Sequence, residues 1–592
     1  MTREQFSIKA TINRIGLPWT LFIGVLIGAG IGVAAGVATS AFAIVGDTPK
    51  SAAATSLPPS AKTAGLAASY LVGRHAEAAA DGRIAVDFYS RAMELDPQNT
   101  ALLQNAYFLA AQTGDYPAAV RAASRAYDSL PRKGMASIVL AVDHFKRQEY
   151  AQALRYLEKN GQQSINTFSL PLLRSWAVAP TQPVEAALEE LTALKAFREI
   201  DDLIVVMSAM LNEFYGRPDE ALKQYDLLAS RIETSRFSTL RQVAEGYRRL
   251  GKIDQLKDIF ARYIKMHDAA TTLDAYAASV IAAQPQKITA QQGMSEALYG
   301  AAELLVMSEP DEFRARMATV YAQSAIYLNP DMDIARRFIG STLAARGRFA
   351  ESNAMLASLK KSAPGYLDVQ MQMVENNVRL NRADAAIGIL QTVLKEKPSW
   401  SEAHVAMGDI LRQEKKYGEA VSAYDNAIKF APTGKTENWA IYYTRGIAAE
   451  RNKNWDQAER DLRKALELQP NEPSVLNYLG YSYLDRGVKL PEARKLIESA
   501  YQQRPNDGYI IDSYGWALYM NGEYEKALIN LEKAVESTPS DGTINEHLGD
   551  VYWKVGRRNE ARFQWQRSLS LEIEDPQRAA IRGKLERGLA QQ

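Results

Sequence analysis

The chain has 592 residues, no cysteine and a formal net charge of +1 at pH 7, from 70 basic and 69 acidic residues. The lack of cysteine excludes disulfides, thiolate metal sites, cysteine nucleophiles and the lipid-modified cysteine of a bacterial lipoprotein. The balanced charge does not favour a nucleic-acid partner, because proteins that bind nucleic acid carry a basic patch or stripe. Apolar residues make up 47% of the chain, which is enough to form a buried core.

Residues 1–17 form a basic N-terminal segment, and residues 18–45 contain no charged side chain. As a helix the second segment would be about 40 Å long, which exceeds the ~30 Å of a bilayer core. It is also longer than the apolar core of a signal peptide, which is about 7–15 residues. Because the basic residues precede this span and Asp47 follows it, we expect a membrane anchor whose N-terminus is cytoplasmic.

Two interpretations of this span stay open. Glycines recur at every fourth position, and such a stripe of small residues lets membrane helices pack closely, so an anchor would self-associate or pack on a partner helix. Alternatively, Ala41-Phe42-Ala43 is a signal-peptidase site and the mature chain begins at Ile44. Both interpretations place the rest of the chain outside the cytoplasmic membrane, on the periplasmic side if the cell has one. The glycines of the stripe are Gly24, Gly28, Gly32 and Gly36.

The remainder of the chain is expected to be a flexible linker followed by helical hairpins. The linker is rich in Ala, Ser, Thr and Pro. In the middle of the chain prolines interrupt the helical pattern, yet strand-like alternation is absent, so we expect degenerate helical repeats there. Residues 269–297 fit the pattern least well and are either an insertion or a lid. The expected segments are the linker 46–65, an N-terminal block of hairpins 66–163, the degenerate repeats 164–298, a C-terminal block in regular register 299–575, and a polar capping helix 576–592.

The clearest pattern runs from Pro473 to Asp575 and repeats with a period of about 34 residues, which indicates a solenoid of stacked helix pairs. A first Gly lets the two helices of a pair approach closely, and a second Gly takes positive φ in the turn. An Ala marks the helix crossing, where a larger side chain would overpack, and a Pro ends the second helix. These residues are Gly480, Gly487, Ala493 and Pro505, then Gly515, Gly522, Ala527 and Pro539, then Gly549, Gly556 and Ala561.

These offsets resemble the tetratricopeptide repeat, and the C-terminal run 507–565 looks like the last repeats of proteobacterial cell-envelope proteins of this kind. The resemblance implies an all-α solenoid of about 13 stacked hairpins with a C-terminal capping helix. It implies a scaffold for other proteins without naming a partner. The Lys and Asn clamp of repeats that bind chaperone tails is not reproduced, and the cysteine-rich knuckle of the lipopolysaccharide-regulating type is absent.

By the same resemblance, set positions on the first helix of each pair line a concave face. Aromatic rings beside acids on such a face suit an extended peptide or a helix with apolar and basic side chains. Alternatively, several of the rings pack between neighbouring repeats, while the Asp and Asn side chains are expected to face solvent. The candidate partner-binding residues are Tyr443, Asn477, Tyr481, Tyr509, Asp512, Trp516, Tyr519, Glu546, Asp550 and Trp553.

We expect no metal, cofactor or catalytic site. The histidines lie on separate repeats with no His-Glu-x-x-His, and neither a G-x-S-x-G motif nor a Walker A loop occurs. The sequence therefore predicts a non-enzymatic scaffold of the cell envelope. One alternative is a soluble exported adaptor that holds secreted polypeptides or polysaccharide. Another is an enzyme with an irregular site, which predicts a polar pocket within 164–298. The histidines are His75, His144, His267, His404 and His547.

Overall fold

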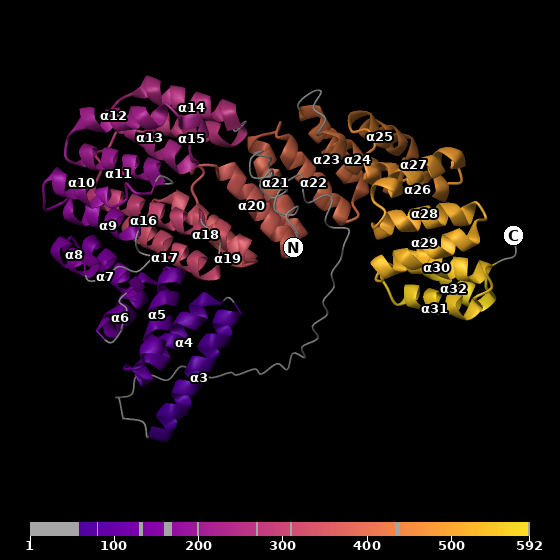
Figure 1. Ribbon diagram of the computed structural model, residues 1–592, viewed down its shortest axis with the longest axis horizontal. Coiled ribbons are helices and arrows are strands. Elements are labelled where there is room, and N and C mark those ends of the chain that lie inside the picture. Colours follow the sequence, from indigo (N-terminus) through magenta and orange to yellow (C-terminus); the bar gives the residue numbers. More distant parts are fainter. Residues whose placement is uncertain are drawn as a thin grey trace. The chain divides into compact units, whose positions relative to one another are not determined.

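The protein is all-α, as the computed structural model shows (Figure 1). The structure describes residues 59–79, 81–128, 134–158, 168–197, 200–267, 270–307, 311–431 and 438–589, and within these ranges it contains helices and no strand. This confirms the predicted helical solenoid. The expected membrane span, 18–45 with its glycine stripe, lies outside the described residues. No helix among those described is both long enough and apolar enough to cross a bilayer.

The described chain divides into two compact units, with the division after Val393. In the described residues, all helices except α15, α20, α21 and α32 pack in thirteen pairs of consecutive helices, or hairpins. The helices of unit 1 are α3 (Pro59–Ala78), α4 (Gly82–Leu95), α5 (Thr100–Thr113), α6 (Tyr116–Tyr127), α7 (Gly134–Lys146), α8 (Tyr150–Glu158), α9 (Ser169–Val178), α10 (Val184–Thr192), α11 (Asp201–Phe214), α12 (Pro218–Ala229), α13 (Phe237–Arg249), α14 (Ile253–His267), α15 (Ala270–Ala282), α16 (Ala290–Met307), α17 (Glu312–Leu328), α18 (Asp333–Ala345), α19 (Phe349–Leu356), α20 (Tyr366–Arg379) and α21 (Ala383–Glu396), with one 3-10 turn, η3 (Ile232–Thr234).

Unit 2 is a regular stack of hairpins closed by a single helix. Its helices are α22 (Ser401–Gln413), α23 (Tyr417–Phe430), α24 (Trp439–Arg451), α25 (Trp455–Leu468), α26 (Pro473–Asp485), α27 (Leu490–Gln503), α28 (Gly508–Met520), α29 (Tyr524–Ser537), α30 (Gly542–Lys554), α31 (Arg558–Leu569) and α32 (Asp575–Arg587).

Small residues at the helix crossings and glycines in the turns have the roles that the sequence predicted. A Cβ on Gly480 would lie 2.7 Å from Cγ1 of Ile497, so only glycine allows this approach of α26 and α27. The turn residues Gly487 and Gly522 have φ values of 65° and 78°. The crossing residues are fully buried in every hairpin from α16 to α31; they are Ala318, Ser352, Ala386, Ala420, Ala458, Ala493, Ala527 and Ala561.

The first helix begins earlier than expected. The sequence predicted a linker up to residue 65, but α3 begins at Pro59. Proline is favoured at the first position of a helix because its missing N–H has no intrahelical partner there. Residues 59–65 are therefore helical, and residues 46–58 lie outside the described part of the chain.

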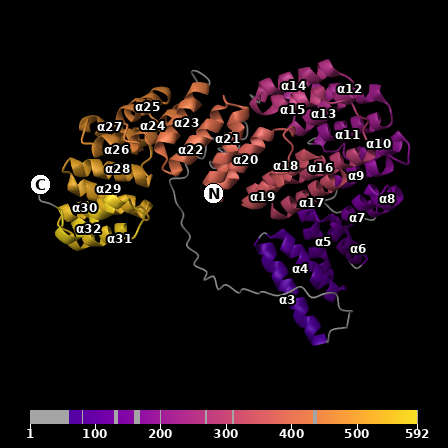
Figure 2. The same cartoon turned by 180° about the vertical axis from the view of Figure 1, so that it is seen from behind.

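The hairpin α16–α17 packs against the inner side of the N-terminal hairpins. Helices α5, α7, α9 and α11 are the first helices of four consecutive hairpins; α16 packs on α9 and α11, and α17 packs on α5 and α7. Figures 1 and 2 show this arrangement from opposite sides. The stretch around 269–297, which fitted the repeat least well, supplies α15 and the start of α16. The chain therefore fills the inner face of its own N-terminal hairpins.

Glycines on one face of α16 make this close packing possible. A Cβ on Gly293 would lie 2.2 Å from the Trp176 indole of α9, which is fully buried. A Cβ on Gly300 would lie 2.8 Å from Leu203 of α11. These glycines are seven residues apart, which places them on the same side of the helix.

Helix α17 is fixed to the same face by aromatic stacking and buried hydrogen bonds. The rings of Tyr116 and Tyr327 stack with centroids 3.9 Å apart. The hydroxyl of Tyr116 donates to Ser324 Oγ over 3.1 Å. Lys146 Nζ donates to the Tyr327 carbonyl over 2.7 Å. These contacts join residues that lie more than one hundred and eighty positions apart in the chain.

A nearly buried ion pair joins α13 to α16. Arg241 Nη1 and Nη2 donate to the two carboxylate oxygens of Glu296 over 2.8 and 2.5 Å, and Gln242 Nε2 donates to the same carboxylate over 2.9 Å. Burial alone would raise the pKa of Glu296, but Arg241, aided by the Gln242 amide, outweighs burial and holds it below 4.5. The charged form is thus the one that the fold stabilises.

We predict that Gly293→Ala destabilises unit 1 and that Gly388→Ala does not. Both residues lie within helices, but a Cβ on Gly388 would meet nothing within 4 Å. The overpacked variant should lose about 1–3 kcal/mol, whereas the control should gain up to about 1 kcal/mol from the better helix propensity of alanine. Hydrogen exchange in α9 and α16 measures the difference. Equal effects of the two substitutions would show that Trp176 moves aside freely.

We predict that Glu296→Gln lowers the free energy of unfolding by about 3–5 kcal/mol at pH 7, because it leaves the buried Arg241 without a counter-ion. Since the folded pKa of Glu296 lies below its unfolded value of 4.5, its contribution is present above pH 4.5 and is lost as the pH falls through the folded pKa. Urea unfolding at several pH values should show this loss in the wild type and not in the variant. A pH profile that the substitution leaves unchanged would contradict the assignment.

Candidate partner-binding surface

The first helices of unit 2 line one side of the stack. Helix α26 packs on α28, and α28 packs on α30, in addition to the partner that each has within its own hairpin. The chain also curves back on this side, because Arg451 Nη1 at the end of α24 pairs with Glu574, just before α32, over 2.9 Å. The first helices therefore form the inner face of unit 2.

Aromatic rings from two neighbouring hairpins stack on this inner face. Trp516 lies 4.0 Å from the His547 ring of α30, at an interplanar angle of 13°, and 4.6 Å from Tyr519, at 11°. Tyr519 is one helical turn after Trp516 on α28. Tyr481 of α26 lies 6.4 Å from His547. The rings thus pack between hairpins, as in the alternative interpretation, while Tyr481, Trp516 and Tyr519 stay half-buried and reachable from solvent.

The sequence analysis expected Asp512 to face solvent, but the structure buries it. It is 6% exposed, and its carboxylate oxygens lie 2.9 and 3.1 Å from His547 Nδ1. Burial alone would lower the pKa of His547, but the Asp512 carboxylate, with two acids of α30, outweighs burial and raises it. The pair therefore favours the imidazolium, and the imidazole ring stacks on Trp516.

Glu546 and Asp550 are also buried, at 8% and 4% exposed, because α32 covers them. Lys584 Nζ lies 2.6 Å from a carboxylate oxygen of each residue. The Trp565 indole N–H donates to the second oxygen of Asp550 over 2.8 Å. Burial alone would lower the pKa of Lys584, but the two carboxylates raise it. These acids hold the capping helix and do not face solvent.

The sequence analysis missed Lys584 and considered His547 only as a histidine without the spacing of a metal ligand. A signal for Lys584 does exist, since Gln577, Ile581, Lys584 and Gly588 recur at helical spacing along one side of α32. Ile581 is fully buried, and Gln577 Nε2 donates to Glu546 over 2.6 Å. The capping helix thus presents a polar and apolar stripe to the last hairpin.

The other candidates lie around this cluster or apart from it. Tyr443 packs edge-on to Tyr478 at 6.0 Å. Asn477 Oδ1 is a buried atom without a hydrogen-bond partner. Tyr509 is 42% exposed, and Trp553 lies against Gly588 of α32. The structure therefore brings Tyr481, Trp516 and Tyr519 together with the buried acids and places Tyr443 and Trp553 in packing contacts of their own.

The tyrosines of the inner face lie in an acidic field. The pKa of Tyr481 is raised first by burial and then by four carboxylates, foremost Asp512 and the exposed Asp485. Burial and the carboxylate of Asp550 likewise raise the pKa of Tyr519. A positively charged group placed beside these rings would therefore be stabilised.

Comparison with known proteins identifies the repeats. The tetratricopeptide-repeat family model matches residues 373–435 and 443–508. TPR repeat-containing protein PA4667 of Pseudomonas aeruginosa is 29% identical over 211 residues, which are 34% of this chain and 35% of that protein. The human aspartyl/asparaginyl beta-hydroxylase is 32% identical over 107 residues, which are 18% of this chain and 14% of that protein.

Solved structures include similar helical stacks. The crystal structure of the APC/C hetero-tetramer Cut9–Hcn1 aligns with 89% of this chain and 96% of that chain, at 16% identity and a TM-score of 0.36. The sequence matches span 35% of the length of PA4667 and 14% of that of the hydroxylase. From its periodicity, its helical hairpins and the family-model match, the chain contains tetratricopeptide repeats and resembles a repeat protein of Pseudomonas aeruginosa, a proteobacterium.

Proposed function

We propose that the protein is a non-enzymatic scaffold of the bacterial cell envelope that binds a partner polypeptide on the inner face of unit 2. The observation that supports this most is the half-buried ring cluster of Tyr481, Trp516 and Tyr519 beside an excess of carboxylates. Rigid aromatic rings provide a large contact area at little entropic cost. The partner segment is accordingly a peptide or a helix with apolar and basic side chains.

The proposed location rests on the sequence of the N-terminus. Residues 18–45 are free of charge and long enough for an anchor, which would hold the repeats on the periplasmic side and allow self-association through the glycine stripe. The A-x-A site that ends at Ala43 supports a second candidate, a soluble exported adaptor for secreted polypeptides or polysaccharide. Full-length protein that needs detergent for extraction supports the anchor, and a soluble chain that begins at Ile44 supports the adaptor.

The relatives do not support the alternative hypothesis that the chain is an enzyme with an irregular site. The human hydroxylase shares a segment of 107 residues with this chain, and that segment is 14% of its length. Because the shared segment is so small a part of that protein, the similarity does not carry its reaction to this chain.

We predict that a basic peptide binds the inner face through its rings. Peptides selected from a random library on the full-length protein should combine basic and apolar residues. The double variant Tyr481→Ala/Trp516→Ala should weaken their binding at least ~10-fold, because central aromatic residues dominate interface energies. Calorimetric titration measures the Kd of both proteins, and circular dichroism verifies that the variant is folded.

The matched control is Phe563→Ala, which removes a ring that is 65% exposed on α31, a second helix of its hairpin. This control should bind the selected peptides like the wild type. If the double variant also keeps the wild-type Kd, the rings of the inner face are packing residues and the proposed surface is wrong.

We predict that Asp485→Lys lowers the affinity for the same peptides by a few fold and makes their binding less dependent on salt concentration. Asp485 is exposed and adds to the acidic field at Tyr481, so its reversal repels a basic ligand. Glu536→Lys, an exposed acid on α29, makes the same change in net charge away from the inner face and serves as control. Equal losses in both variants would assign the effect to overall charge alone.

A further inference from the structure

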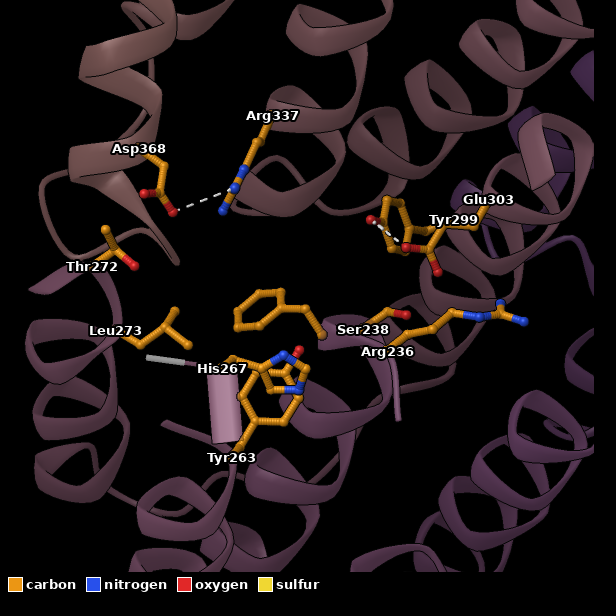
Figure 3. A pocket seen from close by; sticks show the side chains of 11 residues that line it. Arg236, Ser238, Tyr263, His267, Thr272, Leu273, Tyr299, Glu303, Arg337 and Asp368 are labelled. Atoms are coloured by element: carbon orange, nitrogen blue, oxygen red, sulfur yellow. Dashed lines mark hydrogen bonds and ion pairs between the residues drawn. The ribbon is translucent and has the colours of Figure 1, made fainter. Parts of the chain in front are cut away.

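The carboxylates that face a pocket in unit 1 are engaged within the chain. The pocket has a volume of ≈ 350 Å³, is lined by residues of α13 to α16, α18 and α20, and lies only partly within the degenerate repeats (Figure 3). Oδ2 of Asp368 lies 3.6 Å from Nη2 of Arg337. Burial raises the pKa of Glu303, whereas hydrogen bonds from hydroxyl groups and the charges of Arg241 and Arg236 lower it. Both carboxylates therefore have partners from the chain itself.

On the inner face of unit 2, Asp485 has no such partner. It is the last residue of α26 and is exposed. In the part of the chain that the structure describes, its side chain makes no ion pair within 4.0 Å and accepts no hydrogen bond. The next cations along the chain are engaged elsewhere, because the Arg486 guanidinium lies 4.6 Å from the centroid of the Trp455 ring and Lys489 pairs with Glu459. The Asp485 carboxylate is therefore available to a partner.

Tyr481 lies one helical turn before Asp485 on the same face of α26, since residues four positions apart on a helix are neighbours. The ring is half-buried, and among the described residues the hydroxyl has no hydrogen-bond partner. Helix α26 ends at Asp485, and the C-terminal end of a helix carries partial negative charge. A guanidinium or ammonium between this ring and this carboxylate would gain cation–π attraction and a charge-assisted hydrogen bond.

The other three carboxylates of the acidic field around this tyrosine already have partners. Asp512 lies 2.9 Å from Nδ1 of His547, and Glu546 lies 2.6 Å from Nζ of Lys584. Asp541 accepts hydrogen bonds from two backbone N–H groups in the first turn of α30, over 2.9 and 3.0 Å. The acid at the end of α26 is therefore the one that a cation of the partner would complete.

Trp516 does not offer a comparable place, because both faces of its indole are covered. The His547 ring stacks on it at 4.0 Å and 13°, and the Tyr519 ring at 4.6 Å and 11°. Two rings that stack this closely on one face would overlap each other, so they lie on opposite faces. Burial lowers the pKa of His547, but Asp512 raises it to a greater extent, so a positive charge is already favoured against one face of Trp516. The indole therefore presents its edge to a partner.

We propose that Tyr481 and Asp485 form the subsite for a lysine or arginine side chain of the partner polypeptide. The edge of Trp516, on the neighbouring helix α28, receives an adjacent apolar side chain. Because α26 packs on α28, the partner segment crosses the two helices with its basic residue on α26 and its apolar residue on α28. This inference rests on the function proposed for the inner face and adds the place at which the positive charge is recognised.

The test combines changes in the peptide with changes in the full-length protein. The probe is the tightest library peptide that the double variant Tyr481→Ala/Trp516→Ala weakens, with copies in which arginine is replaced by citrulline or lysine by norleucine. At one basic position the neutral copy should bind the wild type at least ~10-fold more weakly, a difference of about 1.4 kcal/mol. Calorimetric titration gives the ratio of the two Kd values for each protein.

The single variants assign this ratio to one side chain. Tyr481→Leu and Asp485→Asn should lower the affinity for the charged peptide and reduce the ratio to below ~3-fold, because each removes part of the subsite. Trp516→Leu should lower the affinity for both peptides and leave the ratio at ~10-fold. Glu536→Gln, which neutralises an exposed acid of α29, is the matched control for Asp485→Asn and should keep both the Kd and the ratio.

Two results would overturn the subsite while the partner surface stands. They are a wild type that binds the charged and the neutral peptide equally, and a ratio that falls in Trp516→Leu but persists in Asp485→Asn. If the double variant weakens none of the selected peptides, the partner surface itself is wrong and the subsite is wrong with it. Circular dichroism of each variant separates loss of the subsite from loss of the fold.

Discussion

A helical hairpin of this type can bury its apolar face only against a neighbour, so every end and inner face of a stack needs a cover. In this protein the chain supplies several of the covers itself. The hairpin α16–α17 lies on the inner helices of the N-terminal hairpins, and α32 lies on the last hairpin of unit 2 with Ile581 fully buried. The inner face of unit 2, where the partner surface is proposed, keeps half-buried rings that solvent can reach.

Covering a face of a repeat protein also brings its charges out of water. Helix α16 carries two carboxylates, Glu296 and Glu303, that are seven residues apart and have different partners. Glu296 pairs with Arg241, which holds its pKa down, while burial raises the pKa of Glu303 although two hydroxyl donors and two arginines oppose the rise. In unit 2 the acids of α30 are neutralised by a lysine of the capping helix. A buried charge is tolerated where the covering helix supplies its opposite.

The sequence predicted the features that depend on local spacing. The crossing alanines, the turn glycines and the ends of the hairpins follow from one repeat at a time, and the structure has them where expected. The inner-face hairpin could not be foreseen, because the hydrogen bond between Tyr116 and Ser324 spans 208 positions and no period of the repeat encodes it. Asp512 and Asp550 were expected in solvent, because their partners His547 and Lys584 lie 35 and 34 positions further along, on another helix.

The wrapping of unit 1 around α16–α17 also bears on how the chain folds. An ordinary solenoid has contacts that are near in sequence, so it can fold from any point and grow hairpin by hairpin. Here the inner helices α5 to α11 are synthesised well before the hairpin that covers them, and until it arrives they expose apolar surface such as Trp176. Closing loops of this length slows folding and prolongs the lifetime of an aggregation-prone intermediate. The part of unit 1 from α5 to α17 is therefore expected to fold as one cooperative body, because a chain that ended before α16 would leave this inner face uncovered.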